Sequence, residues 1–282
     1  LTVMRDLFAD AHYDSDATFS YRQHSWLLAR NGGTIAVPVL TTLEGVRVDF
    51  TAGNTFALPS LATATNVRFV INRPVDLSRL TQADGSHFIV NAAMALPVLV
   101  QAQRSTTTGG QTSWTEFELN APTALPVLAL IDGSSIFVRN GVSVAIPSVT
   151  SYTNTLARQA FLKAEGAGSV LSLPNAASLR TSDPSENSDL FVDASAGGRV
   201  ELPAVTLIED AFRTANEIRI TSDGVNSMVS MPSLTVMRDL FADAHYDSDA
   251  TFSNRQHSWL LARNGGTIAV PCLLYTSDAA DE

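Results

Sequence analysis

A short motif centred on one proline recurs along this chain and limits what the chain can fold into. Nine of the twelve prolines occupy the same position of the motif, as in "GGTIAVPVLTTL", "GNTFALPSLATA" and "GGRVELPAVTLI". The residue before the proline is apolar in every copy, and the residue two positions further back is apolar in all copies but one. This period of two is typical of β-strands. The nine prolines are Pro38, Pro59, Pro97, Pro126, Pro147, Pro174, Pro203, Pro232 and Pro271.

The full repeat unit contains a second strand and two kinds of turn. A short alternating run precedes the motif, such as "VRVDF" from Val46, and Gly, Asn or Asp-Gly often follows it. These residues tolerate positive φ and favour turns. Proline suits a corner because a corner needs no ladder N–H group. The unit is therefore strand, turn, strand, proline corner and an "xLxxL" segment, and the shortest interval between anchor prolines is 21 residues.

One such unit buries too few apolar side chains to fold alone, so neighbouring units must stack. We predict a single domain over residues 1–271: an all-β, right-handed parallel β-helix of about nine coils. Extra residues fall mainly between the "xLxxL" segment and the next strand, which predicts loop insertions on one edge. The two longest predicted insertions are Val67 to Ser86 and Arg238 to His257.

Helical alternatives remain open for two segments. "TLIEDAFRTANEI" from Thr206 and "NTLARQAFLKAEG" from Asn154 contain good helix formers with some i, i+4 apolar spacing. Short inserted helices are therefore an alternative there. An all-helical repeat is disfavoured by the density of Pro and Gly, and a leucine-rich-repeat horseshoe by the absence of its Asn-centred consensus.

The chain also carries a long exact duplication. Residues Leu1 to Pro38 recur as Leu234 to Pro271 with a single difference, Tyr21 against Asn254. This predicts a window from a longer repeat array. The last residues, "CLLYTSDAADE" from Cys272, break the motif and resemble a translated sequencing adapter, so residues 272–282 are interpreted as a non-native tail. The tail holds the only cysteine, so no disulfide framework or thiolate site is expected.

Over residues 25 to 271 the repeats resemble those of large secreted bacterial β-strand-repeat proteins, whose coils read "GGxhxLPxLTxh" with h apolar. The motifs that carry this resemblance are "NGGTIAVPVLTTL", "GSVLSLPNAASL" and "GGRVELPAVTLI". It implies a right-handed parallel β-helix in a surface or adhesin-like protein. We accordingly expect an extracellular or cell-surface location, a structural or adhesive role, no catalytic activity and no cofactor.

Composition excludes some partners. The chain is 45% hydrophobic and 16% charged, which indicates a folded protein rather than a disordered one. Its formal net charge is −10 and Lys163 is its only lysine, so no basic face for nucleic acid is expected. The longest apolar stretch, from Phe88, contains Asn91 and Pro97 and is too short to span a bilayer.

Two copies of an acidic loop, "DAHYDSDATFS", offer candidate metal ligands. They lack the central Gly and terminal acidic ligand of an EF-hand, so a solvated loop is favoured over a weak cation site. His24 and His257, beside Trp26 and Trp259, are interpreted as corner residues rather than acid–base groups. The candidate ligands are Asp10, Asp14, Asp16, Asp243, Asp247 and Asp249.

The alternative function is a polysaccharide lyase or glycoside hydrolase, because many β-helices act on polysaccharides; this rests on analogy of fold. Its candidate residues are Glu116, Glu118, Asp132 and Arg139. No standard catalytic motif supports it. If the chain is a recognition surface, we expect a glycan or a surface protein to bind along the insertion edge, where sequence can vary without disturbing the rod.

Overall fold

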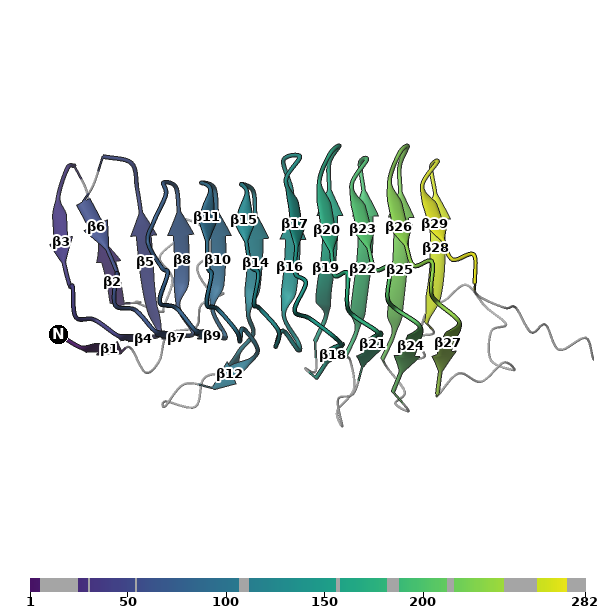
Figure 1. The fold of residues 1–282 in the computed structure, drawn as a ribbon, viewed down its shortest axis with the longest axis horizontal. Coiled ribbons are helices and arrows are strands. Elements are labelled where there is room, and N and C mark those ends of the chain that lie inside the picture. The colour runs from purple at the N-terminus through teal and green to yellow at the C-terminus, as the bar shows by residue number, and fades with distance from the viewer. Residues whose placement is uncertain are drawn as a thin grey trace, which may run out of the picture.

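The computed structural model describes residues 1–5, 25–29, 31–53, 55–106, 112–155, 158–181, 188–211, 216–240 and 258–272. Every regular element in these residues is a β-strand, and all the strand pairs are parallel except one short hairpin. The strands stack into a rod, with each turn of the chain lying beside the previous one (Figure 1). This confirms the predicted parallel β-helix. Within the described residues there is no helix of the length and apolarity needed to cross a membrane.

Each coil has three sides. The first side forms one continuous sheet of ten strands, which we call the long sheet. Its strands are β2 (Ser25–Leu28), β5 (Val46–Phe50), β8 (Arg68–Ile71), β10 (His87–Val90), β14 (Glu116–Leu119), β16 (Ser135–Val138), β19 (Ala160–Glu165), β22 (Leu190–Ser195), β25 (Ile218–Asp223) and β28 (Trp259–Arg263). Ten strands in register define ten coils.

The second side carries the strand that precedes each corner. These strands are β3 (Thr34–Ala36), β6 (Thr55–Ala57), β11 (Met94–Ala95), β15 (Thr123–Ala124), β17 (Ser143–Ala145), β20 (Val170–Ser172), β23 (Arg199–Glu201), β26 (Met228–Ser230) and β29 (Thr267–Ala269). The third side follows the corner. Its strands are β1 (Val3–Arg5), β4 (Thr42–Glu44), β7 (Thr63–Thr65), β9 (Gln82–Asp84), β18 (Tyr152–Asn154), β21 (Ser178–Thr181), β24 (Leu207–Asp210) and β27 (Val236–Asp239).

The corner is a tight turn with the anchor proline at its second position. In the second coil the N–H group of Leu61 donates to the carbonyl oxygen of Leu58 at 3.1 Å across Pro59. Successive corners are also bonded to one another, since the Ser60 hydroxyl donates to the carbonyl oxygen of Pro38 at 2.6 Å. Ser148 and Asn175 make the same link to Pro126 and Pro147. The corners at these positions therefore stack in a column, as the repeat predicts.

The structure has ten coils, one more than the number of anchor prolines. The additional coil lies in a segment that we predicted to be an insertion, and that prediction was wrong. Val67 to Ser86 is not an insertion, because it contains long-sheet strand β8 and third-side strand β9. Ser78 takes the place of the proline in this coil. The N–H group of Leu80 donates to the Leu77 carbonyl oxygen at 3.0 Å, as the matching residues do in the second coil.

Connections of variable length do fall on one edge, between the third side and the next long strand. The one antiparallel pair, hairpin β12 (Ser105–Thr106) and β13 (Thr112–Ser113), is inserted there. The alternative of a helix after Asn154 is not realised in the described residues, because "AFLKAE" forms strand β19. Ala160, Leu162 and Ala164 of this strand point inward and its other side chains point outward.

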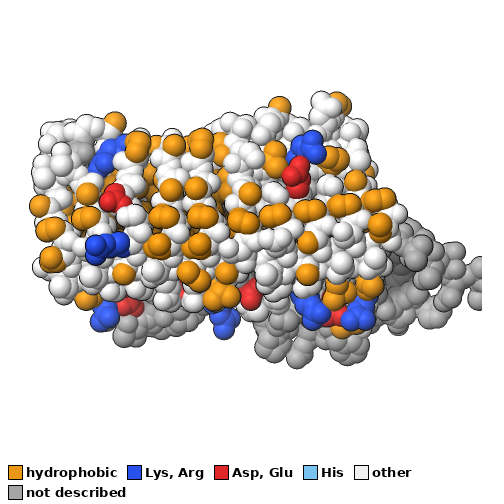
Figure 2. All heavy atoms as spheres, viewed as in Figure 1, with side chains coloured by type: hydrophobic (Ala, Val, Ile, Leu, Met, Phe, Trp, Pro, Cys, Tyr) orange, Lys and Arg blue, Asp and Glu red, His pale blue; other side chains and the backbone are white. Residues whose placement is uncertain are grey.

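The core runs through the inside of the rod. It is made of stacked rows of Leu, Val, Ile and Phe, most of them fully buried. Phe69, Phe88 and Phe117 from three successive long strands stack with ring centroids 4.7 and 4.9 Å apart. Because the coils repeat, equivalent side chains also line up on the surface. On the face seen in Figure 2, hydrophobic side chains form rows along the rod and charged side chains are sparse.

Candidate functional site

The outer face of the long sheet gathers most of the described groups that bear on function. Side chains alternate between the two faces of a strand, so outward residues of successive coils form columns along the rod. The central column is Leu28, Asp49, Val70, Ile89, Glu118, Phe137, Lys163, Asp193, Thr221 and Leu261. Two parts of this face are chemically distinct: a histidine cluster in the middle coils and a groove in the last coils.

We call His87, Glu116, Glu118 and Arg139 the histidine cluster. The Nε2 atom of His87 lies 2.8 Å from Oε1 of Glu118 and 3.5 Å from Oε1 of Glu116. The Arg139 guanidinium lies 3.3 Å from the other carboxylate oxygen of Glu118. The structure thus brings together three of the four residues that the sequence nominated for an enzyme, and adds a histidine from the neighbouring strand β10.

The neighbours of Glu118 in the histidine cluster favour its ionised form. The hydrogen bond from His87 holds the pKa of Glu118 below its usual value, against the effect of burial, and the positive charges of Arg139 and Arg68 act in the same direction. The Nε atom of Arg139 also lies 3.3 Å from Glu165 on the next coil. A carboxylate held ionised in this way is suited to act as a base or an ion-pair partner, not as a general acid.

The donor types in this cluster are those of a metal site. One nitrogen of His87 and one oxygen each of Glu116 and Glu118 all lie within 4.8 Å of one another. However, the Glu118 carboxylate already has His87 and Arg139 as partners, and a divalent cation would compete with both. We therefore describe the cluster as an ion-pair network.

Asp132, the fourth nominated residue, has a different role. It stands at the turn that leads into β16, and its carboxylate accepts a hydrogen bond from the backbone N–H group of Thr153 at 2.8 Å. Partial burial raises the pKa of Asp132, and this hydrogen bond lowers it. Its contacts are those of a turn residue.

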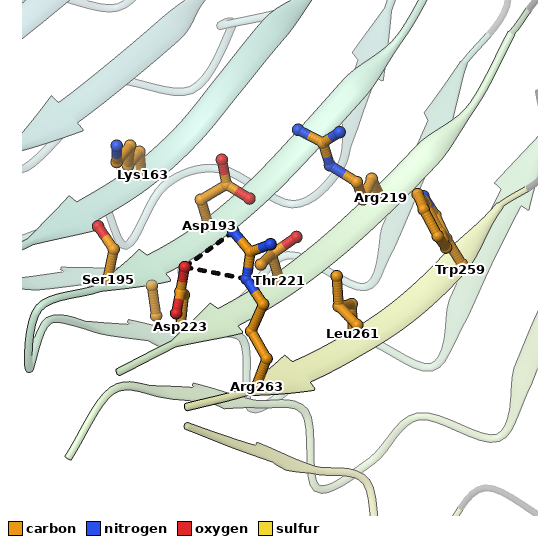
Figure 3. A pocket seen from close by; sticks show the side chains of 10 residues that line it. Lys163, Asp193, Ser195, Arg219, Thr221, Asp223, Trp259, Leu261 and Arg263 are labelled. Carbon is orange, nitrogen blue, oxygen red and sulfur yellow. Dashed lines mark hydrogen bonds and ion pairs between the residues drawn. The ribbon is translucent and has the colours of Figure 1, made fainter. Parts of the chain in front are cut away.

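The second part of the face is a groove over coils seven to ten, which we call the C-terminal groove (Figure 3). It is open to solvent and has a volume of about 290 Å³. Strands β19, β22, β25 and β28 each contribute to it. Its lining residues are Lys163, Asp193, Ala194, Ser195, Arg219, Thr221, Asp223, Trp259, Leu261 and Arg263.

Cations and carboxylates alternate along the groove. Arg263 binds Asp223 through Nε at 3.0 Å and through a terminal nitrogen at 2.8 Å (Figure 3). A hydrogen bond from Asn264, together with Arg263, holds the pKa of Asp223 below its usual value. Burial raises the pKa of Asp193, whereas the charges of Arg219 and Lys163 and the nearby Thr221 hydroxyl lower it.

Arg219 is held in place by an aromatic neighbour. Its guanidinium carbon lies 4.1 Å from the centroid of the Phe191 ring, a cation–π arrangement. Its neighbour in register on the last coil is Trp259, and Figure 3 shows the two side chains next to each other at one end of the groove. The groove therefore combines an indole ring with charged and hydroxyl groups.

Several sequence-based candidates lie outside the described residues. These are Asp10, Asp14, Asp16, Asp243, Asp247 and Asp249, and also His24 and His257. The predicted tail lies outside them too, apart from Cys272, which is exposed and not in a disulfide.

Sequence reasoning missed His87 and the C-terminal groove. The available signal was polar residues at alternate positions of strands that are otherwise apolar, as in "FLKAEG", "LFVDAS" and "IRITSD". Aligning these strands coil by coil would have placed Lys163, Asp193 and Thr221 in one column.

Three comparisons with known proteins were made: against models of protein families, against curated proteins and against solved structures. None of them found a match to this chain.

Proposed function

We propose that this chain is a structural and adhesive segment of a β-solenoid repeat protein, located outside the cell or on its surface. The proposal rests above all on one observation: ten coils share one unbroken core and display on one side a ten-stranded sheet whose outer face carries a polar groove. A rod of this kind holds recognition groups at fixed spacing without needing a catalytic centre.

We place the partner on the outer face of the long sheet. The sequence pointed instead to the insertion edge, but the first of its two long insertions is a regular coil. Cations on the sheet face have carboxylate partners, as Lys163 and Arg139 have in Glu165 and Arg263 has in Asp223. Such a face suits a glycan or a protein rather than nucleic acid, which requires unbalanced positive charge.

The second candidate function is a polysaccharide-acting enzyme, and the contact between His87 and Glu118 favours it. In a lyase, Glu118 would take the proton next to a sugar carboxylate paired with Arg139. A carbon–carbon double bond then forms as the bond to the glycosidic oxygen breaks, and that oxygen takes up a proton from solvent as it leaves. We rank this second, because Arg139 is already engaged by both Glu118 and Glu165.

One experiment separates the two functions. The full chain is incubated with immobilised neutral polysaccharides (xylan, mannan, β-glucan), acidic ones (polygalacturonate, alginate) and extracellular-matrix proteins. Retention and released products are measured together. We expect retention on at least one material and no new reducing ends or unsaturated products. Product that disappears in Glu118→Gln would instead establish the enzyme, and retention on none of the materials would contradict the adhesive role.

The same assay locates the binding surface. A chain in which residues 241–257 and their copy, residues 8–24, are both replaced by short Gly-Ser linkers keeps the described sheet face. Equal retention of this chain is the result expected for binding on the sheet. Loss of retention with an unchanged circular dichroism spectrum would instead place the partner on the insertion edge.

A further inference from the structure

We propose that the C-terminal groove is a saccharide-binding site that takes a short neutral oligosaccharide or the end of a neutral polysaccharide. This inference rests on the proposed adhesive function and names its ligand class. It is carried by three features of the groove: hydrogen-bonding atoms that lack well-aligned protein partners, a flat apolar wall and cations that already have carboxylate partners.

The first feature is a set of three buried polar atoms. Oδ1 of Asp193, Oγ of Ser195 and Oγ1 of Thr221 are shielded from solvent, and none of them makes a well-aligned hydrogen bond within the described residues, although the Thr221 hydroxyl lies close enough to Asp193 to lower the pKa of that carboxyl. Thr221 is only 8% exposed. Buried polar atoms are nearly always hydrogen-bonded in native proteins, so three such atoms lining one groove indicate a place where something else supplies the bonds.

The chemistry of these atoms matches neighbouring hydroxyl groups. A carboxylate oxygen only accepts hydrogen bonds, whereas a hydroxyl both donates and accepts. Asp193 and Thr221 are partners in register on adjacent strands, and Ser195 lies on the same strand as Asp193 and on the same face. The Asp193 carboxylate is thus a hydrogen-bond acceptor that lies near two hydroxyl groups, those of Thr221 and Ser195, which can donate. Adjacent hydroxyl groups on a sugar ring satisfy such a pattern, because each of them also donates and accepts.

The second feature is the wall of the groove. Trp259 and Leu261 lie on the same face of strand β28 at one side of the groove (Figure 3). An indole offers a large rigid apolar surface with a polar edge, which suits ligands that are partly apolar. Sugar rings are of this kind, since their C–H groups gather on the ring faces and their hydroxyls on the rim. The volume of about 290 Å³ lies near the lower end of small-molecule sites, which fits a short saccharide.

The third feature is charge. Every cation of the groove has a carboxylate partner: Arg263 pairs with Asp223, Lys163 with Glu165, and Arg219 lies 3.9 Å from Glu217. A uronate or sulfate would have to compete with these carboxylate partners for the cations, and the two aspartates of the groove would repel it. A neutral saccharide avoids this cost, so it is the class we assign.

The test uses the full chain with neutral oligosaccharides prepared from xylan, mannan and β-glucan, and binding is measured by titration calorimetry. Thr221→Val keeps the shape of the side chain and removes its hydroxyl. Asp193→Asn keeps the size and removes the charge. We expect each variant to bind the best oligosaccharide at least tenfold more weakly than the unmodified chain. Ile89→Val, in the same column but outside the groove, serves as the matched control and should bind normally.

Thermal melting separates loss of binding from loss of folding. Thr221→Val removes a buried hydroxyl that has no well-aligned partner among the described residues, so its melting temperature should be unchanged or higher. Weaker binding together with an intact melting curve supports the site. Normal binding by both groove variants overturns the groove while leaving the adhesive function standing. Binding to acidic polysaccharides or proteins alone would overturn the groove in the same way. Binding to none of the materials contradicts the adhesive function itself.

Discussion

At the scale of single residues, the inward positions of the coil tolerate the least change. Leu173 is fully buried, directly before the corner proline, and belongs to the continuous core. We predict that Leu173→Asp destabilises the protein by at least about 3 kcal/mol, because it loses apolar contacts and buries a charge without a partner. Denaturant unfolding followed by circular dichroism measures this change. Ala177→Asp, at an exposed position four residues away, is the control and should cost little. Equal stability of the Leu173 variant would show that this position is not inward-facing.

A group of buried carboxyls near the insertion edge predicts a dependence of stability on pH. Burial and the nearby charge of Asp189 raise the pKa of Glu217 to about 7, although Arg219 opposes the shift. Burial raises the pKa of Asp210 to about 6. A raised pKa means that the folded state binds protons more tightly than the unfolded chain. These two groups therefore reduce stability as the pH rises from about 4 to about 7.

Glu217→Gln tests this directly, because glutamine resembles the protonated side chain. We expect the variant to be more stable than the original chain at pH 8, by on the order of 1–3 kcal/mol, and nearly equal to it at pH 5. Melting curves at the two pH values give the comparison. Glu201→Gln, on the second side of the rod, is the matched control for the substitution itself. A gain of the same size at both pH values would contradict the assignment to titration of Glu217.

At the scale of elements, the corner is defined by its turn and not by proline itself. In the third coil Ser78 replaces the proline, and its N–H group donates to the Asp76 carboxylate at 3.0 Å. This bond and a second one with the Ser78 side chain hold the pKa of Asp76 below its usual value. Asp76 thus satisfies the N–H group that proline lacks in the other coils.

This replacement leads to a paired prediction. Ser78→Pro should fold with stability within about 1 kcal/mol of the original chain, because the gain from a stiffer unfolded chain offsets the lost hydrogen bond. Arg79→Pro, one position later in the same turn, should destabilise clearly, because proline there forces Ser78 out of its turn conformation. Thermal melting of both variants decides the matter. If both variants are equally destabilised, the third coil does not turn at Ser78.

The same coil shows how much of the fold could be predicted. The apolar pairs around the corner, such as Leu77 and Leu80, were visible in the sequence, but counting prolines hid this unit. Strand and corner were predictable because they follow from local alternation and turn chemistry. Strand β19 was harder to predict, because its Ala, Leu, Lys and Glu residues also favour helix. Its strand conformation depends on the hydrogen-bonded pairing with β16 and β22.

At the scale of the whole molecule, the candidate sites depend on register between coils, which local patterns do not reveal. Glu116 and Glu118 are neighbours in one strand and were nominated together. His87 joins them only because β10 pairs with β14 residue by residue. The C-terminal groove combines Lys163 with Arg263, one hundred residues later. Each coil adds a connection of different length, so such columns appear only once the coils are stacked.

The duplication makes a prediction about how such rods extend. At the N-terminal end of the rod, Arg5 of β1 pairs with Glu44 at 2.9 Å, and the Arg47 guanidinium lies 4.7 Å from the Trp26 ring centroid. The C-terminal end repeats the sequence of the N-terminal end, and its strands β27, β28 and β29 match β1, β2 and β3. Its open edge therefore offers Arg238 and Trp259 in the places of Arg5 and Trp26.

We predict that a chain in which residues 39–271 follow Pro271 directly forms one longer rod with a continuous core. Glu44 of the added copy would extend the alternation of Arg180, Glu209 and Arg238 along the third side, where Glu209 already binds both arginines. Small-angle scattering should show a rod about twice as long, and melting should occur in one transition. The control joins residues 60–271 instead, which omits Glu44 and Arg47 and so offers the edge an unmatched coil. We expect its junction to be cleaved readily by proteases while the matched junction resists. Equal resistance of the two junctions, or independent melting of the two halves in the matched chain, would show that the shared sequence does not define a stacking edge.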